Sequence, residues 1–406
     1  MKKTALAMLL CSPWAHSSGL LLQEAVTANA GTGGAGDGVY TQTATANWTN
    51  PATMSHMGEQ LTTINTLLFN LQMDYYDESP SSDTGEHTGN ADAQTIMPSI
   101  GIFHVMQLNE EVHLGLNFGA VGGSSIEYGT NWDAANHLDR AFMSAMQFNP
   151  NVSFAITEHF SFGFGAQVNY GLIEVSTSSF ETEMGSDWAY GYNFGAMYQE
   201  QNWALGVSYR SKLVHEFDVD AQTIQAANLG PTISLPTSTP FEVGTELVVP
   251  TIIDLSGSYS ITSEIDLLAS IQYHRWSEFN ETPVYNDTLN QLEVLGVPQA
   301  IDRDWQDVWK FAIGTDYQLN ADWALKAGFS YETSPQDDPT KQWVDLPVGE
   351  QYRYSLGAST YWKKSRIDLF YEYADFGEMD IEREPLAQIS GTFSGNIHFI
   401  GANVTF

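Results

Sequence analysis

The stretch that decides the fold runs from Val308 to Glu332 and reads VWKFAIGTDYQLNADWALKAGFSYE. Along Val308 to Leu319, large apolar side chains alternate with small or polar ones, so the two kinds fall on opposite faces of an extended chain. Asn320 to Asp322 form a tight turn, and Trp323 to Glu332 alternate in the same way. The stretch predicts a β-hairpin with one strongly apolar face.

This unit repeats along the chain beyond about residue 60. Alternation predicts strands near 61–74, 94–107, 112–126, 146–157, 160–178, 187–199, 203–217, 241–260, 265–279, 305–319, 323–333, 350–362, 366–376 and 390–406. The even number of strands, fourteen, is what a closed bacterial barrel requires. Short turns alternate with long polar loops, which places the turns on the periplasmic side and the loops outside.

Composition narrows the class of protein. The 406 residues include 49 Asp and Glu against 15 Lys and Arg, a net charge of -34, which excludes binding to nucleic-acid phosphates. After the N-terminus no stretch has the roughly 18 apolar residues of a membrane helix, so a lipid-embedded chain must be a closed barrel. Tryptophans at predicted strand ends are expected to form the interfacial girdles of such a barrel: Trp203, Trp276, Trp305, Trp323 and Trp362.

The first 17 residues read as a signal peptide. Lys2 and Lys3 supply its positive charge, an apolar run ends at Cys11, and small residues near Ser17 suit cleavage. An acylated Cys11 is the alternative, disfavoured because a leucine precedes it where a small residue is required. Cys11 is the only cysteine, so the exported chain is expected to carry no disulfide and no thiolate metal site, and no cofactor is expected.

Residues 18–57 differ from the rest in being rich in Ala, Gly, Thr and Asn and weakly patterned. The segment is too poor in apolar residues for a core of its own. It is either a flexible leader or a plug inside the barrel, whose lumen fourteen strands leave too wide for side chains alone to fill. The expected domains are therefore 1–17, a signal peptide; 18–57, a hatch; and 58–406, a transmembrane β-barrel.

Several motifs together resemble one known family, the FadL-type (FadL/TodX/OmpP1) outer-membrane transporters of long-chain fatty acids and other hydrophobic compounds. The matching stretches are SGLLLQE at 18–24, NWTNPA at 47–52, WALGVSYR at 203–210, WSEF at 276–279, AIGTDY at 312–317, AGFSYETSP at 327–335 and YSLGA at 354–358. The similarity spans nearly the whole chain after the signal peptide.

The resemblance implies a fourteen-stranded barrel closed by an N-terminal hatch and passive, ligand-gated transport. An apolar molecule is caught on an outer apolar patch, passes to a pocket, displaces the N-terminus of the hatch, and leaves sideways where the third strand kinks. It also implies that Asn50, Pro51 and Ala52 belong to the hatch; without the family they would be read as an ordinary turn. An alkyl chain that leaves sideways into the lipid does not have to cross an aqueous pore. Exposure to water in such a pore would cost about 0.8 kcal/mol per CH₂.

The third predicted strand holds glycines at positions 115, 119, 122 and 123. Glycine inside a strand marks a bulge, a kink or a close backbone approach. Gly119, Gly122 and Gly123 are therefore the candidates for the kink and the lateral gap. General softness of a glycine-rich sheet is the alternative.

The loop Trp132 to Phe148 is the candidate for the outer apolar groove, because Leu138, Phe142, Met143 and Met146 recur in it at roughly helical spacing. Flexible methionines beside aromatic residues suit a varied apolar ligand. A short helix that packs on the barrel rim explains the spacing equally well.

A carboxylate ligand in a low-dielectric lumen needs a cation. Arg210, Arg303, Lys310 and Arg353 are the candidates, and alternation also turns Lys326 inward. Each could instead pair with a lumen carboxylate, for which Asp316, Glu332 and Glu372 are placed. No Lys or Arg occurs between Arg140 and Arg210, which favours a neutral ligand.

The sequence therefore predicts a monomeric, non-enzymatic outer-membrane transporter of long-chain fatty acids, with neutral or aromatic hydrocarbons as the alternative substrate. Its acidic loops, for example Asp337 and Asp338, are expected to contact lipopolysaccharide through divalent ions. A general diffusion porin is one rival. The other is a barrel lipid hydrolase that uses Ser124 with His104 or His113.

Overall fold

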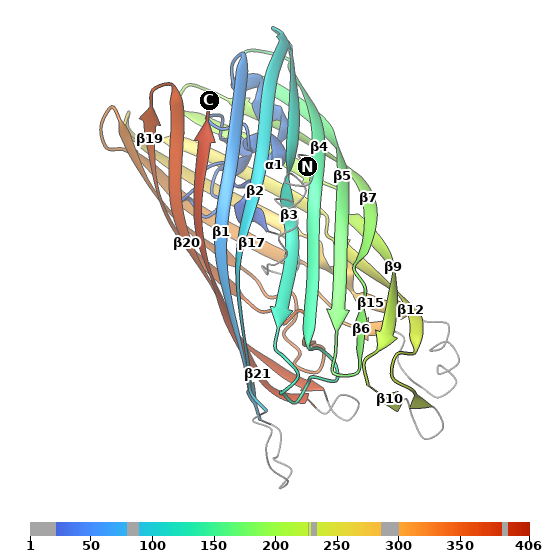
Figure 1. The fold of residues 1–406 in the computed structure, drawn as a ribbon. Coiled ribbons are helices and arrows are strands. Elements are labelled where there is room, and N and C mark those ends of the chain that lie inside the picture. Colours follow the sequence, from blue (N-terminus) through green and yellow to red (C-terminus); the bar gives the residue numbers. More distant parts are fainter. Residues whose placement is uncertain (1–21, 79–88, 226, 229–233, 286–299, 384–388) are drawn as a thin grey trace.

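The strands close into one antiparallel barrel. The structure, a computed structural model, describes residues 22–78, 89–225, 227–228, 234–285, 300–383 and 389–406. The first strand, β1 (Gln60–Asp77), pairs with β2 (Ala91–Asn109) on one side and with β21 (Ile389–Thr405) on the other. Because the first and last strands pair, the ring has no free edge. Figure 1 shows the closed wall, with the C-terminus at the end that carries the short turns.

Fourteen strands form the ring, as predicted. In order they are β1, β2, β3 (Val112–Glu127), β4 (Arg140–Ala155), β5 (Phe160–Ser176), β7 (Gly185–Gln199), β8 (Trp203–Arg210), β13 (Ile252–Ser260), β14 (Ile265–His274), β17 (Val308–Gln318), β18 (Trp323–Glu332), β19 (Gln351–Trp362), β20 (Ser365–Arg383) and β21. The quoted hairpin is β17 and β18, which pair from Lys310–Glu332 to Gln318–Ala324.

Seven further strands lie at the loop end. They are β6 (Phe180–Thr182), β9 (Leu213–Thr223), β10 (Ala227–Asn228), β11 (Ser234–Leu235), β12 (Pro240–Val249), β15 (Glu281–Tyr285) and β16 (Ala300–Asp302). β10 and β11 form a separate two-stranded sheet, and the other five extend the wall. β9 and β12 continue β8 and β13 after breaks and pair with each other. One break contains Pro250, which has no N–H to donate to a ladder. The predicted single strands 203–217 and 241–260 are therefore each interrupted.

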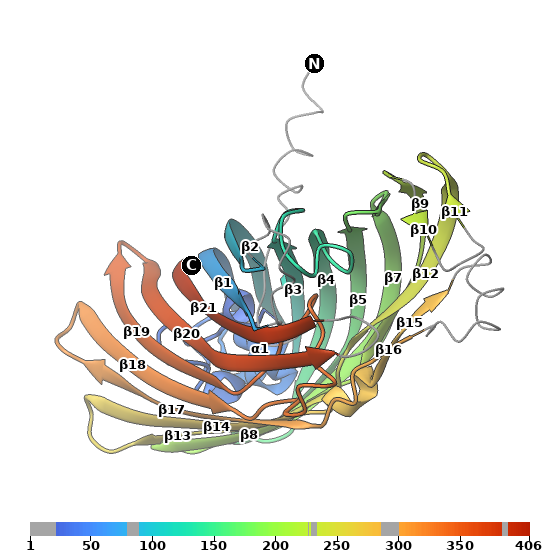
Figure 2. The ribbon, with the colours of Figure 1, turned by 90° about the horizontal axis from the view of Figure 1, so that it is seen from below.

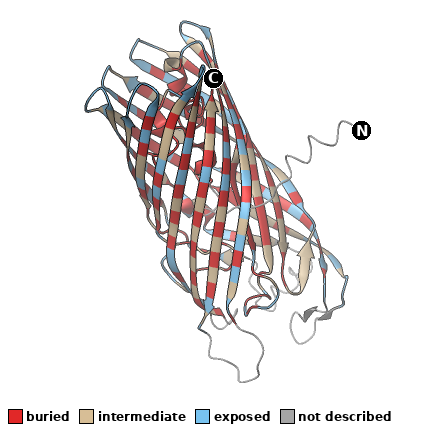
Figure 3. Cartoon of the chain, turned by 60° about the vertical axis from the view of Figure 1, so that its left-hand side comes forward, coloured by how far each residue is buried: buried red, intermediate tan, exposed pale blue. Residues whose placement is uncertain are grey.

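The alternation predicted for the strands gives an apolar outer face. On β17, Trp309, Phe311 and Ile313 are exposed, whereas Lys310 and Ala312 between them are buried. Figure 3 shows this alternation of buried and exposed residues along the neighbouring strands. An outer face built of such large apolar side chains is stable in lipid and unfavourable in water.

The tryptophan girdle is only partly as predicted. Trp203, Trp323 and Trp362 are exposed at strand ends. Trp276 and Trp305 are buried instead, and their rings meet edge to face with centroids 5.3 Å apart. Trp276 opens a 3₁₀ turn, η4 (Trp276–Phe279), which follows β14 where the prediction continued the strand. The prediction failed here because alternation was extended through a segment that folds back on itself.

Residues 22–57, called the inner segment below, lie inside the ring of strands (Figures 1 and 2). They form η1 (Gln23–Val26), η2 (Asp37–Val39), α1 (Ala46–Thr49) and η3 (Pro51–His56). The segment hydrogen-bonds to strands around the whole ring, from β3 and β4 through β14 and β17 to β20. In the described part of the chain, none of the helices has the length and apolar character to cross a membrane.

The composition of the inner segment explains how it fits. Gly31, Gly33, Gly34 and Gly36 have positive φ, which glycine adopts without strain, so the chain can turn tightly. Asp37 fastens the resulting loop, because its carboxylate accepts hydrogen bonds from the backbone N–H groups at 28 and 29 and from the Thr27 hydroxyl. Burial raises the pKa of the Asp37 carboxyl above its ordinary value. The segment thus folds inside the ring through polar contacts, and its few large side chains, Tyr40, Trp48 and Met54 among them, pack in an apolar cluster with the wall.

Candidate functional site

The lumen changes character along its length. On β1, Thr63 and Asn65 face inward near the short turns, and Leu67, Phe69, Leu71, Met73 and Tyr75 follow towards the loops. On β21, Asn403 and Thr405 lie beside Asn65 and Thr63, and Phe399, Ile397 and Phe393 lie beside the apolar residues. The apolar residues of both strands belong to one buried apolar cluster, together with Trp132 and Leu138 of the loop before β4. The loop-side half of the lumen is therefore apolar, whereas the half near the short turns is polar.

β3 and β2 separate in the middle of the wall. Their pairing runs from Val112–Asn109 to Gly119–Gly101 and does not extend to the loop-side halves of the two strands, all of whose residues are described. On its other side, β3 carries a bulge: Ala120 pairs with Met146 and Gly122 with Ala145, so Val121 is the extra residue. Gly123 has a φ of 156° and Gly119 lies against Gly101. The glycine-rich stretch thus contains both a bulge and a break in pairing.

The start of the inner segment lies against this break. The backbone N–H of Leu22 donates to the carbonyl of Val121, the bulged residue, at 3.0 Å. The Asn65 amide on β1 donates to the carbonyl of Ala25 at 3.4 Å. Leu22 and Ala25 also belong to the apolar cluster of the lumen. Helix η1 therefore connects the break in the wall to the apolar half of the lumen.

The inner segment meets β5 and β7 at Asn50, Pro51 and Ala52. The Asn50 side chain accepts from the N–H of Ala52 at 3.0 Å and so caps η3, whose first residue is Pro51. Its amide nitrogen donates to Gly38 O at 2.8 Å and to Ala196 O on β7 at 3.2 Å. Asn50 therefore joins two turns of the inner segment to the wall.

The four candidate cations are buried, but their partners differ. Arg303 pairs with Asp345 at 2.6 Å and packs on the Phe279 and Trp305 rings. Arg353 pairs with Glu24 of η1 at 3.0 Å and with Glu332 at 3.3 Å, while Glu372 lies 3.8 Å away. For these two, the alternative of carboxylate pairing holds.

Lys310 and Arg210 form no ion pair within the described part of the chain. Lys310 Nζ donates to Gln23 Oε1 at 2.7 Å. Arg210 donates to Trp48 O at 2.5 Å and to the side-chain oxygens of Gln147 and Gln167 at 2.5 and 2.7 Å, and it lies 3.9 Å from the centre of the Trp48 ring. Each cation is thus solvated by neutral groups.

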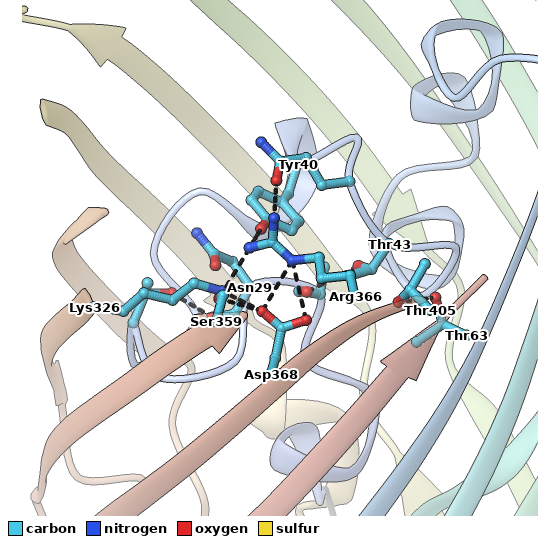
Figure 4. A network of polar contacts seen from close by, with 12 residues as sticks. Asn29, Tyr40, Thr43, Thr63, Lys326, Ser359, Arg366, Asp368 and Thr405 are labelled. Carbon is cyan, nitrogen blue, oxygen red and sulfur yellow. Dashed lines mark hydrogen bonds and ion pairs between the residues drawn. The ribbon is translucent and has the colours of Figure 1, made fainter. Parts of the chain in front are cut away.

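A second charged cluster lies nearer the short turns (Figure 4). Lys326 Nζ is 2.9 Å from Asp368, and Arg366 donates to both oxygens of that carboxylate at 3.1 and 3.2 Å. Arg366 also donates to the hydroxyl of Tyr40 at 2.8 Å and bonds to Gln42. One carboxylate therefore faces two cations, and the cluster ties the inner segment to β20.

On the side of the lumen opposite this charged cluster, the inner segment meets side-chain amides of β3, β4 and β7. Asn117 and Asn151 donate to the Asn47 side-chain oxygen at 2.7 and 2.9 Å, while Asn149 and Asn193 continue the network. These five residues are almost completely buried. Between Arg140, at the loop end of β4, and Arg210, at the end of β8, the described strands of this side contain no Lys or Arg.

Comparison with known proteins assigns the family. Residues 8–406 match the family described as outer membrane protein transport protein (OMPP1/FadL/TodX). The chain belongs to this family. Outer membrane protein P1 of Haemophilus influenzae is 25% identical over 436 residues, which cover 91% of this chain and 88% of the relative. The long-chain fatty acid transport protein of Escherichia coli O6:H1 is 21% identical, with 99% and 97% covered.

Solved structures agree on the fold of the FadL family. A Pseudomonas aeruginosa FadL homologue has a TM-score of 0.82 at 17% identity, with 96% of this chain and 99% of that one covered. The Pseudomonas putida toluene transporter TodX has a TM-score of 0.65 at 15% identity, with 97% and 98% covered. The protein is thus an outer-membrane β-barrel of a family that transports hydrophobic compounds.

The loop conformation expected for the outer-groove residues of this FadL-family chain is corrected by the structure, while their role as a groove stays a prediction. β4 begins at Arg140, six residues earlier than predicted, so Phe142, Met143 and Met146 are strand residues. Leu138 stays in the loop and joins the apolar cluster described above, whereas Met143 belongs to a second apolar cluster with Phe217 and Trp276. Met146 is half-buried. The helical spacing was accidental, because the strand's alternation also places apolar residues at several of these intervals.

The proposed Ser124 nucleophile and its two histidines lie far apart. His104 pairs with Leu116, so roughly 25 Å of strand separates it from Ser124, and His113 is farther still along β3. His104 instead bonds to Thr62 at 2.8 Å, and His113 to Gly58 O at 3.2 Å. The strand register therefore does not bring either histidine to Ser124.

Gln23 and Glu24 were missed as site residues. The motif 18–24 was noted only as part of the resemblance, although Gln23 and Glu24 hold two of the candidate cations. A polar pair directly after three leucines was the available signal, since such a pair must leave the apolar environment to find partners. The predicted signal peptide, 1–17, and residues 18–21 lie outside the described residues.

Proposed function

We propose that this protein takes up long-chain fatty acids through the outer membrane and releases them sideways between β2 and β3. The observation that carries the proposal is the break in the wall beyond Gly101–Gly119, which adjoins the bulge at Val121 and meets η1 from inside. An opening there leads from the apolar half of the lumen towards the lipid. The relatives that act on long-chain fatty acids and on toluene support an apolar ligand.

The apolar half of the lumen suits the alkyl chain. The inward side chains of β1 and β21, together with Trp132 and Leu138, form a continuous buried cluster on which the chain can lie. Each CH₂ removed from water there stabilises the bound state by about 0.8 kcal/mol. A carboxylate head group then needs a cation, and Lys310 and Arg210 are the two candidates without an ion pair among the described residues.

The inner segment is proposed to act as the gate. In the structure it crosses the lumen from the break in the wall to β5 and β7, where Asn50 anchors it. We therefore expect an ion current close to zero through the unliganded protein in a planar bilayer. A large, steady current would instead support the porin hypothesis and contradict this proposal.

Uptake measurements test substrate and route together. Cells that lack their own transporter and express this chain are expected to accumulate labelled oleate above the empty-vector level. Deletion of Val121 removes the extra residue and extends the register between β3 and β4, so it should reduce oleate uptake to near that level. Retention of wild-type uptake by a folded deletion variant would overturn the lateral route.

Deletion of Leu108 is the matched control. Leu108 is the extra residue of another bulge, between Gln107 and Asn109, at the opposite end of the pairing between β2 and β3. Its deletion should leave oleate uptake within about twofold of wild type, since the break in the wall is unaffected. Heat-modifiable migration on gels confirms that both deletion variants are folded barrels.

Neutral hydrocarbons are the second candidate substrate. The observation in their favour is that Arg303 and Arg353 already pair with carboxylates of the chain. Labelled toluene is therefore measured beside oleate in the same cells. Uptake of toluene without uptake of oleate would replace the fatty-acid proposal.

A further inference from the structure

Helix η1 presents two adjacent side chains to two lumen cations. Glu24 Oε1 lies 3.0 Å from Arg353 Nε, with both side chains almost fully buried. Gln23 Oε1 accepts from Lys310 Nζ at 2.7 Å, and its amide nitrogen donates to Gln272 at 3.0 Å. A single turn of chain thus provides the oxygen atoms that Arg353 and Lys310 bind.

Arg353 does not require Glu24 for neutrality. Glu332 lies 3.3 Å and Glu372 3.8 Å from its guanidinium, and Gln351 accepts from it at 2.8 Å. The second oxygen of Glu24, Oε2, is buried and has no hydrogen-bond partner among the described residues. Two wall carboxylates therefore lie beside Arg353 in addition to Glu24, which is the carboxylate that comes from the inner segment rather than from the wall.

The same helix covers the break between β2 and β3. Leu22, directly before Gln23, donates its N–H to Val121 O and packs in the apolar cluster. The sequence Leu20-Leu21-Leu22-Gln23-Glu24 has the chemistry of an apolar chain that ends in a carboxylate. The part of this stretch that the structure describes occupies the lumen as such a ligand would: its apolar side chain lies in the cluster and its carboxylate on Arg353.

We infer that Glu24 occupies the place of a ligand carboxylate, and that an amphiphile with an alkyl chain and a carboxylate exchanges with it on Arg353 and Lys310. This inference rests on the proposed function and deepens it. The exchange replaces one carboxylate–arginine contact with another, so the ligand releases η1 from Val121 while Arg353 keeps its number of charged partners. A neutral hydrocarbon cannot make this exchange. Glu24 thus determines specificity for carboxylates.

The unmodified protein gives the first test. Methyl oleate has the chain of oleate without the charge, so vector-corrected uptake of labelled methyl oleate should be at least about tenfold slower than that of labelled oleate. Equal rates would overturn the exchange. If neither compound is taken up above the vector level, the proposed function itself fails, which is a distinguishable result.

Glu24→Gln gives the second test. The variant keeps the shape of the side chain but removes its charge, so η1 is held less tightly. We expect the oleate concentration for half-maximal uptake to fall about three- to tenfold and toluene uptake to rise by a similar factor. Unchanged values for both compounds would overturn the inference, with oleate uptake by the wild type showing that transport itself is intact.

Glu372→Gln is the matched control. It removes the same charge from the surroundings of Arg353, but from β20 rather than from η1. We expect toluene uptake to rise clearly less than in Glu24→Gln, because η1 keeps its contact with Arg353. An equal effect of Glu372→Gln and Glu24→Gln would show that local charge alone matters, and would contradict a role for Glu24 as a stand-in for the ligand.

Discussion

The two sides of the lumen hold the same inner segment by different chemistry. The side formed by β14 and β17–β20 uses ions: Glu24 on Arg353, and Tyr40 and Gln42 on Arg366 beside Asp368. The side formed by β3–β8 uses mainly neutral groups, the Asn47 network and the contacts of Asn50, and its one ionic group on the segment is Arg210, which contacts Trp48. Ionic contacts can be exchanged for a charged ligand, whereas amide contacts cannot. Under the proposed gating, we expect release of the segment to begin on the charged side.

The largest effect is expected on the charged side, from Asp368→Asn. The substitution leaves Lys326 and Arg366 buried without their shared carboxylate, which should lower the free energy of unfolding by about 3–5 kcal/mol. Denaturant unfolding in detergent, followed by tryptophan fluorescence, measures it. The double variant Lys326→Met/Asp368→Asn is the control: it should recover part of the loss, and a loss as large as that of the single variant would contradict the ionic explanation.

Glycines test how closely the two sides approach the segment. A Cβ on Gly328 of β18 would come within 2.0 Å of the backbone of Thr32, and one on Gly163 of β5 within 2.8 Å of Pro51. Gly328→Ala should therefore lower the free energy of unfolding by about 1–3 kcal/mol and raise the ion current through the unliganded protein. Gly163→Ala should have a smaller effect on both quantities. Gly257→Ala, whose nearest contact is 3.5 Å, is the control and should change neither quantity.

The amide side is expected to respond less to a single change. Asn151→Ala removes one donor and one acceptor from the network, but Asn47 keeps its bond from Asn117 and Asn193 its bond from Asn149. We expect a loss of about 1 kcal/mol in the free energy of unfolding and no change in the oleate concentration for half-maximal uptake. A marked change in that concentration would show that the amide side also takes part in gating.

The smallest effect concerns pH on the amide side. Burial, and then the neighbouring His113 and His159, lower the pKa of His56 below its ordinary value of 6.5. A lowered folded-state pKa means that the stabilisation is complete above pH 6.5 and is lost as the pH falls from there through the folded value. The thermal midpoint should therefore drop slightly between pH 7.5 and 5. His56→Gln should make the thermal midpoint less dependent on pH. If the variant keeps the wild-type pH profile, groups other than His56 cause the dependence.

The candidate site could be predicted only in part. The burial of Arg210, Lys310 and Arg353 follows from alternation, because every second residue of a strand faces the lumen. The expected loop conformation with helical spacing was wrong for Phe142, Met143 and Met146, because over a few residues helical spacing and strand alternation overlap and only pairing with β3 and β5 decides between them. The amide network was not predicted at all, since each asparagine by itself suggests a turn or a surface.

The local pattern by itself determined the barrel. Side chains of a strand alternate because of backbone geometry, so the apolar outer face, the number of strands and the inward direction of the lumen cations could be derived from neighbours in sequence. The partners within the lumen were decided only by tertiary structure. Glu24 and Arg353 are 329 residues apart, and only the closure of the ring and the path of the inner segment bring them to 3.0 Å. Ion pairs and hydrogen bonds act over a few ångströms in space and do not depend on separation along the chain, so no local pattern can encode them.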